Sequence, residues 1–547
     1  MENVRFFLIL AVSFLGLLIY QKWQEDYTIN TPLQRTGNPS QQQDYNLQTD
    51  NAAPIINPKF QPKLVSPVPL STADTDSKIT VITDLLTVVI SSRGGTLDSV
   101  TLREYPIDPE TPNDAVELLA NKANRTFIYQ GGLAGSKGLP THNDVYSYDR
   151  LDYEFIRGDD QLIVPLYWTN DEGITIQKNY IFKKGEYLID VEYKVFNKSP
   201  KEIKVHQYGQ LKRNRESSRQ GMLYLFTGAA LSTPEKRYEK YDYGDLEKNP
   251  INISAKESWI AVMEHYFVAA LIPEKTSENH YYSKTNNLDL FTVGFYSQAK
   301  VINANEQASL HSSLYAGPKR HDLLEPLATG LNLTVDYGML WFIAKPLFIV
   351  LDFINDRLHN WGWAIIILTI LLKLLFYPLA AAGYRSMANM RRVQPKLLAL
   401  KERYSDDKAQ LNQGMMKLYK EERINPLGGC LPMLVQIPFF IALYWVLLES
   451  VEMRQAPFIL WITDLSSMDP FYVLPLLMGV SMWFQQKLNP APIDPTQAKV
   501  MKILPFVFTG FFAFFPSGLV LYWLVNNLLS IAQQWRITRM IENAHGA

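Results

Sequence analysis

Apolar residues follow two different patterns along this chain. Long apolar stretches with at most one charged residue occur near the N-terminus and again through the last third of the sequence, at residues 6–21, 361–383, 424–448, 470–486 and 503–535. A membrane-spanning helix needs about 20 mostly apolar residues to cross a hydrocarbon layer roughly 30 Å thick. These stretches therefore predict membrane helices. Residues 78–336 instead show short alternating runs that predict β-strands. We expect a polytopic α-helical membrane protein that carries a large all-β domain.

The first uncharged stretch lies between Arg5 and Lys22. Its length also fits a cleavable signal peptide, but no small-x-small cleavage site follows it. We therefore predict an uncleaved anchor helix over residues 1–24, with its N-terminus in the cytoplasm. Residues 25–77 are rich in Gln, Asn, Pro, Thr and Asp. Because such a composition cannot bury a core, these residues are predicted to form a flexible linker.

Residues 78–336 are predicted to form one antiparallel β-sandwich. Residues 189–195 alternate strictly, as a strand with one buried face should, and weaker alternation occurs at 174–176, 203–205 and 310–314. Expected turns lie at Gly94-Gly95, Gly131-Gly132, 197–200 and 286–287. The histidines here show no metal-ligand spacing: they are His142, His206, His265, His280, His311 and His321. We expect exposed or hydrogen-bonded core histidines, with no metal or cofactor site.

Residues 337–359 are predicted to form an amphipathic helix on the membrane surface. Leu347, Leu351 and Leu358 recur at helical spacing, while Lys345 and Asp352 share another face. A helix with separate apolar and charged faces lies along an interface rather than across it. A short buried helix of the β domain is the alternative that the pattern leaves open.

The apolar stretch at residues 503–535 would be about 50 Å long as one helix, which is too long for a single span. Pro516 and Gly518 interrupt it near the middle, so we predict two helices joined by a tight turn. The two halves and the stretch 470–486 are short. Short spans are accommodated by local thinning of the bilayer. A thinner bilayer would lower the free-energy barrier to moving a polar polypeptide segment across the membrane.

Lys373 is the only charged residue within the stretch 361–383. A charge at the centre of a span costs about 2.5–3.5 kcal/mol on insertion scales, so such residues usually face a partner or a water-filled cavity. Snorkelling to the headgroups is the alternative. Lys373 lies roughly 15 Å from the cytoplasmic end of the stretch, which is beyond the reach of its side chain. We therefore expect Lys373 to face a hydrated space inside the membrane.

The charges of the loops predict the orientation of the helices. Residues 384–425 hold ten Lys or Arg against five Asp or Glu, and the loop 486–502 holds three lysines against one aspartate. Residues 449–470 carry one arginine against four acidic residues. Because positive loops remain in the cytoplasm, both basic loops and a short tail at 536–547 are expected inside. The acidic loop and the β domain are expected outside.

The basic loop 384–425 is itself predicted to form a helical hairpin. Leu397 and Leu400 belong to one helical stripe, and Leu411 and Met415 belong to another. Asp407 would lie at the N-terminus of the second helix, where the helix dipole favours a negative charge. The basic faces are either a solvated surface or a binding site for lipid headgroups or a ribosome. The sequence leaves both open.

The overall composition agrees with a membrane part joined to a large polar part. The chain has 547 residues, of which 47% are hydrophobic, with a net charge of −1 and a mean hydropathy of −0.10. A bundle embedded entirely in the membrane would be more apolar. The single cysteine, Cys430, excludes an intramolecular disulfide and is most simply a packing residue.

Several segments resemble, in order and in spacing, the YidC/Oxa/Alb family of membrane protein insertases. They are 425–438, which reads NPLGGCLPMLVQIP, then 454–458, Asp464-Leu465, and 515–523, which reads FPSGLVLYW. The similarity is strong over residues 361–535, and the outer domain and uncleaved anchor resemble the Gram-negative form. The resemblance implies a five-helix insertase core over residues 360–535 in a bacterial inner membrane.

The resemblance also implies an insertase that is not an enzyme and uses neither nucleotide nor cofactor. In the family, the core helices enclose a hydrophilic groove that carries a positive charge. That position is Lys373 here, where most relatives have arginine, and Thr369 and Gln436 would be further polar groove residues. Lysine keeps the charge but lacks the guanidinium fork, so simple attraction of carboxylates is expected rather than bidentate binding.

A substrate path between the first and last core spans is also implied by the resemblance, at Phe440, Met478, Phe512, Tyr522 and Trp523. Composition alone would make these residues ordinary lipid-facing or packing side chains. The implied partners are nascent membrane proteins, the Sec translocon, membrane lipids and, through the hairpin or weakly through the short tail, a ribosome. No recognition of a specific nucleic-acid sequence is expected.

Two other functional classes compete with an insertase. A secondary transporter would also place a charge within a span, but such folds show repeated halves with broken helices, and the five predicted core helices show no repeat. A membrane-anchored periplasmic carbohydrate-active protein would carry its essential residues in the β-sandwich. The family's outer domain resembles sugar-mutarotase folds, yet this sequence shows no catalytic constellation there.

Overall fold

A computed structural model describes residues 76–155, 158–215, 219–220, 223–224, 226–286, 289–404, 407–422, 431–489 and 495–545. The predicted anchor helix 1–24, nearly all of the predicted linker 25–77 and Cys430 lie outside these residues, as does the first half of the 425–438 segment. The described residues divide into two compact units with the boundary between Val335 and Asp336. Each unit is described by itself.

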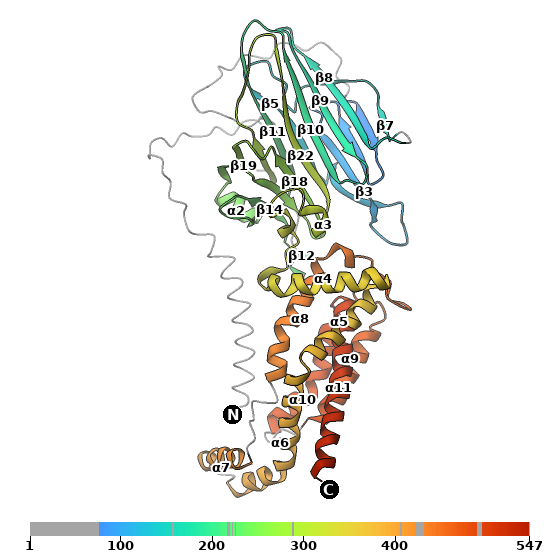
Figure 1. The fold of residues 1–547 in the computed structure, drawn as a ribbon, viewed down its shortest axis with the longest axis vertical. Helices are drawn as coiled ribbons and strands as arrows, with labels where there is room; N and C mark the ends of the chain where they lie inside the picture. Colours follow the sequence, from blue (N-terminus) through green and yellow to red (C-terminus); the bar gives the residue numbers. More distant parts are fainter. Residues whose placement is uncertain are drawn as a thin grey trace. The chain divides into compact units, whose positions relative to one another are not determined.

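The first unit is a β-sandwich of two large sheets (Figure 1). The 11-stranded sheet has the order β16 (Asn252–Ala255), β19 (Asn279–Thr285), β20 (Leu290–Tyr296), β11 (Ile203–Asn214), β5 (Arg125–Gly135), β4 (Ala115–Lys122), β3 (Leu97–Pro106), β2 (Leu86–Ser91), β1 (Lys78–Ile82) and β7 (Asp152–Glu154), with β21 (Lys300–Ile302) paired to β11. The β1–β7 pair is parallel.

The second sheet of the sandwich has nine strands. Their order is β15 (Glu239–Tyr241), β14 (Gly228–Ser232), β17 (Trp259–Met263), β18 (Phe267–Pro273), β22 (Glu306–Pro318), β10 (Leu188–Asn197), β9 (Ile174–Lys183), β8 (Gln161–Thr169) and β6 (Ser147–Tyr148). Smaller elements complete the unit: β12 (Arg219–Gln220), β13 (Leu223–Tyr224), α2 (Tyr243–Lys248), α3 (His321–Leu324) and η2 (Leu331–Thr334). The predicted all-β sandwich is therefore confirmed.

Alternation in the sequence located four of the strands correctly. In β10, every second residue is buried, including Ile189, Val191, Tyr193 and Val195. This strand pairs with β9 and β22, so that Tyr193 lies between Lys178 and Leu310 across the two ladders. The three weaker alternating runs lie in β9, β11 and β22, as predicted.

Gly131-Gly132 does not form the predicted turn. Both residues lie inside the buried strand β5, where a Cβ on Gly132 would come within 2.6 Å of Tyr208 Oη. These glycines therefore make room for tyrosine side chains, a common reason for glycine within a strand. Gly94-Gly95 does turn, with φ values of 69° and 58°. The turn at 197–200 follows β10, and of the pair 286–287 only Asn286 is described, between β19 and β20.

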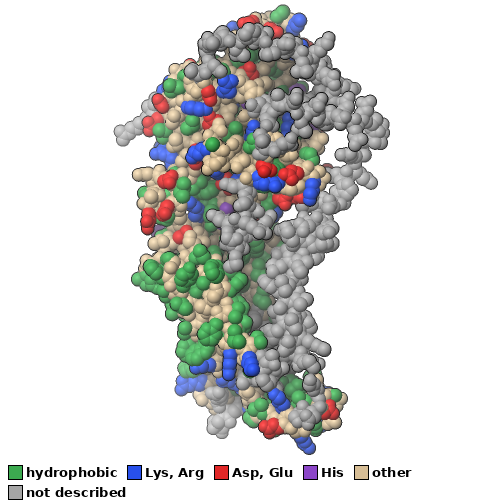
Figure 2. Space-filling view, turned by 180° about the vertical axis from the view of Figure 1, so that it is seen from behind, with side chains coloured by type: hydrophobic (Ala, Val, Ile, Leu, Met, Phe, Trp, Pro, Cys, Tyr) green, Lys and Arg blue, Asp and Glu red, His purple; other side chains and the backbone are tan. Residues whose placement is uncertain are grey.

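The second unit is helical (Figure 1). Its elements are η3 (Gly338–Leu340), α4 (Trp341–Leu358), α5 (Trp361–Leu375), α6 (Tyr377–Arg403), α7 (Lys408–Glu421), α8 (Leu431–Glu449), η4 (Val451–Met453), α9 (Val473–Leu488), α10 (Pro495–Phe512) and α11 (Ser517–His545). Helix α11 packs on α5, α6, α8 and α9, and α10 packs on α9. Figure 2 shows hydrophobic side chains over the visible face of these helices and Lys or Arg side chains gathered toward one end.

The first predicted core span is not a single helix. Helix α5 ends at Leu375, α6 begins at Tyr377, and the two are bent by 67°. Pro378 lies in the first turn of α6, where a proline favours the start of a new helix. Lys373 therefore lies in the last turn of α5, and its placement in mid-helix was wrong.

The predicted break at residues 515–518 is confirmed, because α10 ends at Phe512 and α11 begins at Ser517. The predicted short lengths are wrong for these two helices. Helix α10 begins at Pro495 and α11 continues to His545, through most of the predicted tail 536–547. The uncharged stretches marked only the apolar part of each helix, and charged residues such as Lys499 and Arg536 continue the same helices.

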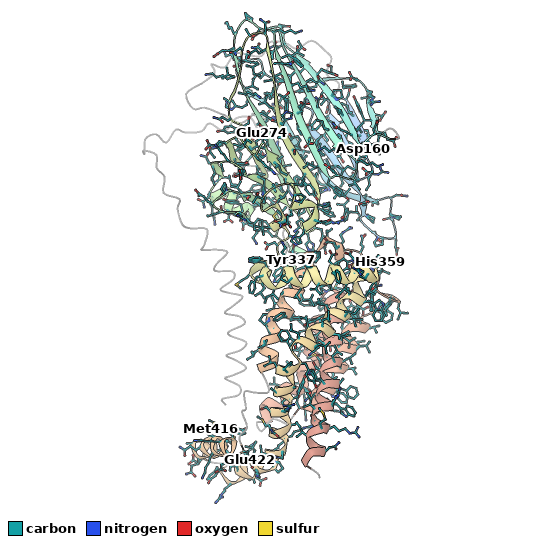
Figure 3. The ribbon with its side chains drawn as sticks, in the orientation of Figure 1. Asp160, Glu274, Tyr337, His359, Met416 and Glu422 are labelled. Carbon is teal, nitrogen blue, oxygen red and sulfur yellow. The ribbon has the colours of Figure 1, made fainter. Side chains whose placement is uncertain are left out.

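Helix α4 lies across the ends of α5 and α8 and packs on both of them (Figure 1). It buries Leu347 and Leu351 and exposes Trp341 and Phe353, and Figure 3 shows it between Tyr337 and His359. Among the described helices, Gly338–Leu358 is long and apolar enough to cross a membrane, and the bent α5–α6 pair would be a second. Helix α4 belongs to the helical unit and not to the β-sandwich; its location at the membrane surface stays a prediction.

The predicted hairpin is built from the end of α6 and from α7. Val393 and Leu397 are buried against Met415 and Leu418. Asp407 caps α7, because its side chain accepts hydrogen bonds from the N–H groups of Ala409 and Gln410 at 2.9 and 3.0 Å. Met416 and Glu422 mark the hairpin in Figure 3.

Candidate substrate-binding site in the helical unit

Lys373 lies where α5 meets α11. Its Nζ donates a hydrogen bond to Ser530 Oγ at 2.7 Å, and Ser530 is 3% exposed. Ser530 Oγ in turn donates to the Asn526 carbonyl oxygen at 2.7 Å. Within the described part of the chain, Ser530 is the only hydrogen-bond partner of Lys373, and no carboxylate lies within ion-pair distance of it. The site therefore holds a half-buried cation with unused donors.

Polar side chains form a stripe along α11 on both sides of this contact. Asn526, Ser530 and Gln534 recur every four residues, which places them on one helix face. Gln436 of α8 donates to Asn526 Oδ1, and Gln534 Nε2 donates to Asn489 Oδ1 at 3.0 Å. The sequence reasoning missed this stripe, although the four-residue spacing of polar residues in an apolar helix was visible.

The two predicted polar groove residues lie in different surroundings. Gln436 is half-buried and bridges α8 to the α11 stripe through Asn526. Thr369 is 1% exposed, and its hydroxyl donates to the Ile365 carbonyl oxygen of its own helix at 2.7 Å. The hydroxyl proton of Thr369 is therefore used within α5, and its assignment to the groove stays a prediction.

Four of the five predicted path residues lie in one aromatic cluster, which consists of Phe440, Phe512, Tyr522, Trp523 and Phe508. The Phe440 ring centroid lies 4.6 Å from that of Trp523 and 6.1 Å from that of Tyr522. Phe512 lies 5.1 Å from Trp523, and Phe508 stacks on Phe512 at 5.9 Å. The cluster joins α8, α10 and α11, rather than the first and last core spans as expected. Met478 is fully buried in α9.

The segment between α8 and α9 forms a cap at the N-terminal ends of α5 and α11. Asp464 Oδ1 accepts hydrogen bonds from the N–H groups of Gln455 and Ser466 at 3.0 and 2.8 Å. Ser517 Oγ donates to the Asp464 carbonyl oxygen at 2.9 Å, and the Gly518 N–H donates to the Leu465 carbonyl oxygen at 2.9 Å. Three segments of the family resemblance thus meet here.

The β-sandwich holds a buried lysine with different partners. Lys178 Nζ donates to the carbonyl oxygens of Gly94, Gly95 and Gly131 at 2.8, 3.2 and 3.2 Å. Burial lowers the pKa of Lys178 well below its usual value. No group of His, Cys, Asp and Glu in the described residues is arranged to hold a metal ion.

These observations define the class of the protein: an integral membrane protein whose helices hold an unpaired cation beside a polar stripe and an aromatic cluster, with a β-sandwich domain attached. The family model of the 60Kd inner membrane protein matches residues 353–544, and the model of the YidC periplasmic domain matches residues 78–350. The chain belongs to the YidC family of membrane protein insertases.

Two full-length sequence relatives support this assignment. The chain is 46% identical to the membrane protein insertase YidC of Thioalkalivibrio sulfidiphilus, over 100% of this chain and 99% of that protein. It is 44% identical to the protein of the same name from Methylococcus capsulatus, over 99% of each chain. A crystal structure titled as an active YidC insertase with its first transmembrane domain resolved matches with 19% identity and a TM-score of 0.39, over 84% of this chain and 92% of that one.

The family and the fold class predicted from the sequence are thus confirmed. The relatives are insertases and not transporters or carbohydrate-active proteins, and the family is not a family of enzymes. Its two matching models describe an inner membrane protein and a periplasmic domain. The residues that carry out insertion are not assigned by these matches.

Proposed function

We propose that the chain inserts nascent membrane proteins by drawing acidic residues of their translocated segments toward Lys373. The observation that supports this is the ammonium group of Lys373, whose single described partner is the neutral hydroxyl of Ser530. Two unit charges 4 Å apart attract by about 4 kcal/mol at an effective dielectric constant near 20. Such an attraction would offset part of the cost of moving a carboxylate out of bulk water.

The apolar segment of the substrate would leave past the aromatic cluster into lipid. Trp523 lies seven residues before Ser530 in α11, roughly 10 Å along the helix axis, so the cluster lies between the cation and the cap. In this proposal the cap closes the outer end of the site, and hydrophobic burial of the substrate drives the step. Thr369 and Gln436 would help to hydrate the site, and Met478 would contribute to the path from α9.

We also propose the orientation and the partners that the sequence predicts. The hairpin and both termini lie in the cytoplasm, α4 lies on the outer membrane surface, and residues 1–24 anchor the chain. The protein works alone or with the Sec translocon. Its hairpin and its C-terminal end contact lipid headgroups or a ribosome. Insertion would need no enzymatic activity and no cofactor, because substrate binding and burial supply the free energy.

The test is a series of substitutions at Lys373. Two reporter substrates that differ only in the acidic residues of the translocated segment are inserted into vesicles that contain each variant. Lys373→Arg should retain or improve activity, because it keeps the charge. Lys373→Ala should slow only the acidic reporter, and Lys373→Glu should slow it further. If alanine slowed both reporters equally, or neither, charge attraction would be the wrong mechanism.

A further inference from the structure

Ser530 is placed so that its hydroxyl must accept a hydrogen bond from Lys373. A serine hydroxyl has one proton to donate and two lone pairs to accept with. The proton of Ser530 is directed to the Asn526 carbonyl oxygen at 2.7 Å, which leaves the lone pairs for other donors. Lys373 Nζ lies at 2.7 Å, and the Tyr384 side chain is a further neighbour of the same hydroxyl. Ser530 thus joins α11 to α5 and α6.

A neutral acceptor has a different effect on a lysine from a carboxylate. Elsewhere in the chain, Lys396 pairs with Glu422 and Lys78 pairs with Asp98, so those ammonium groups already have a counter-charge. Ser530 uses one donor of Lys373 without neutralising it, because a hydroxyl carries no charge. The ammonium group keeps its remaining N–H groups and its full charge for another molecule.

We infer that Ser530 is a positioning residue of the insertion site: it holds the ammonium of Lys373 at the α5–α11 contact so that it can meet substrate carboxylates. This inference rests on the proposed function. Lysine has a long, flexible side chain that loses considerable rotamer freedom when it is fixed. Without Ser530, the ammonium has no described partner to keep it in the site, and it would turn toward water or lipid headgroups.

The experiment compares the paired reporters in vesicles that contain Ser530 variants of the full chain. The measured quantity is the insertion of the acidic reporter divided by that of the neutral reporter. Ser530→Ala should lower this ratio about tenfold, the factor expected from one hydrogen bond to a charged group. Ser530→Thr should keep the ratio, because it keeps the hydroxyl. Ser530→Asp should lower the ratio as Lys373→Ala does, because the new carboxylate would pair with the lysine and compete with the substrate.

Ser481→Ala is the matched control. Ser481 is 5% exposed, its hydroxyl donates to the Met478 carbonyl oxygen at 2.6 Å, and it accepts from Asn527 Nδ2 at 3.2 Å. Its removal therefore deletes a buried hydroxyl of the same bundle that does not contact Lys373, and the ratio should not change. If Ser530→Ala does not fold, Ser530→Cys replaces it, because a thiol has a similar size but is a weak acceptor.

The double variant Lys373→Ala, Ser530→Ala separates this inference from the proposed function. Its ratio should equal that of Lys373→Ala alone, because there is no ammonium group left to position. A further decrease there, or equal slowing of both reporters by Ser530→Ala alone, would overturn the inference, because Ser530 would then act through packing. An unchanged ratio in Lys373→Ala itself would overturn the proposed function. An unchanged ratio in Ser530→Ala, with Lys373→Ala selective, would overturn the positioning role alone.

Discussion

Lys178 is buried and Lys373 is half-buried, and their partners differ. Lys178 donates to three backbone carbonyl oxygens inside the β-sandwich, so its donors are used within the protein. Lys373 has Ser530 as its single described partner. The Lys178 side chain therefore has three hydrogen-bond acceptors around it, whereas the ammonium group of Lys373, which has three N–H donors, has one described acceptor. A structural role follows for Lys178, and a binding role is available to Lys373.

His142 supplies a prediction about pH at the residue scale. It is 3% exposed, and its Nδ1 lies 2.8 Å from Tyr208 Oη. Burial, helped by the nearby charges of Lys178 and Lys212 and opposed by Asp144, lowers the pKa of His142 to about 4. The unfolded chain titrates near 6.5, so it binds more protons than the folded domain between these values, and stability decreases as the pH falls through that window.

The expected loss amounts to about 3 kcal/mol of the free energy of unfolding between pH 6.5 and pH 4. His142→Asn should remove most of this pH dependence, because asparagine does not titrate. The measurement is the urea midpoint of the β-sandwich in the detergent-solubilised full chain at several pH values. His311, whose side chain is 58% exposed, is the control, and His311→Asn should leave the slope nearly unchanged. An equal slope in wild type and His142→Asn would refute the prediction.

Single residues of the site were predictable only where they broke a pattern. Lys373 stands out because it is the one charge in an apolar stretch. Ser530 and Asn526 share the four-residue spacing of the polar stripe, but their partners depend on how α5, α8 and α11 pack. Lys178 follows the buried phase of β9, together with Ile176 and Tyr180. No sequence prediction covered Lys178, because its carbonyl acceptors lie in segments that only the fold brings together.

At the scale of elements, the contact between α9 and α10 depends on one glycine. A Cβ on Gly479 would lie 2.0 Å from Thr509 Oγ1, so Gly479→Ala should push the helices apart. Overpacking of this kind typically costs about 1–3 kcal/mol, part of which the better helix propensity of alanine offsets. Adding Thr509→Ala should restore stability, because it removes the obstructing hydroxyl. Thermal unfolding in detergent measures both effects.

Gly510 provides the control for this prediction. It lies in α10, one residue from Thr509, and a Cβ there would meet nothing within 4 Å. Gly510→Ala should therefore leave the melting temperature unchanged or raise it slightly. A Gly479→Ala protein as stable as wild type, or one that Thr509→Ala fails to rescue, would show that the helices adjust without strain.

Elements were predictable from the sequence where one physical signal dominated. Strict alternation identified β10, and Pro516 with Gly518 identified the break between α10 and α11. The bend at Phe376 was missed, because the apolar stretch continues through it and the signal of Pro378, which lies in the first turn of α6, was not used. Gly131-Gly132 was misassigned to a turn, because the sequence does not show that tyrosines from other strands approach this backbone. Such errors arise where packing between distant segments decides the outcome.

At the scale of the whole molecule, the helical unit has two chemically different ends. At one end, Asn360 Nδ2 donates to the Phe458 carbonyl oxygen at 3.1 Å and holds the cap against α5. At the other, Arg391 of α6 donates to the Lys487 carbonyl oxygen at the end of α9, at 2.9 Å, and the basic hairpin follows. Because positive charge is retained in the cytoplasm, the cap should lie outside and the hairpin inside.

Cysteine labelling tests this orientation, because Cys430 is the single cysteine of the chain and Cys430→Ser gives a clean background. Leu460 in the cap is 82% exposed and Met416 in the hairpin is 66% exposed, so cysteines at both positions should react without disturbing the core. A membrane-impermeant thiol reagent applied to cells with a permeabilised outer membrane should label Leu460→Cys and a third site in the β-sandwich, Glu274→Cys. Met416→Cys should react only after the inner membrane is opened. Reaction of Met416→Cys and Leu460→Cys under the same condition would contradict the orientation, and with it the proposal that the cap closes the outer end of the site.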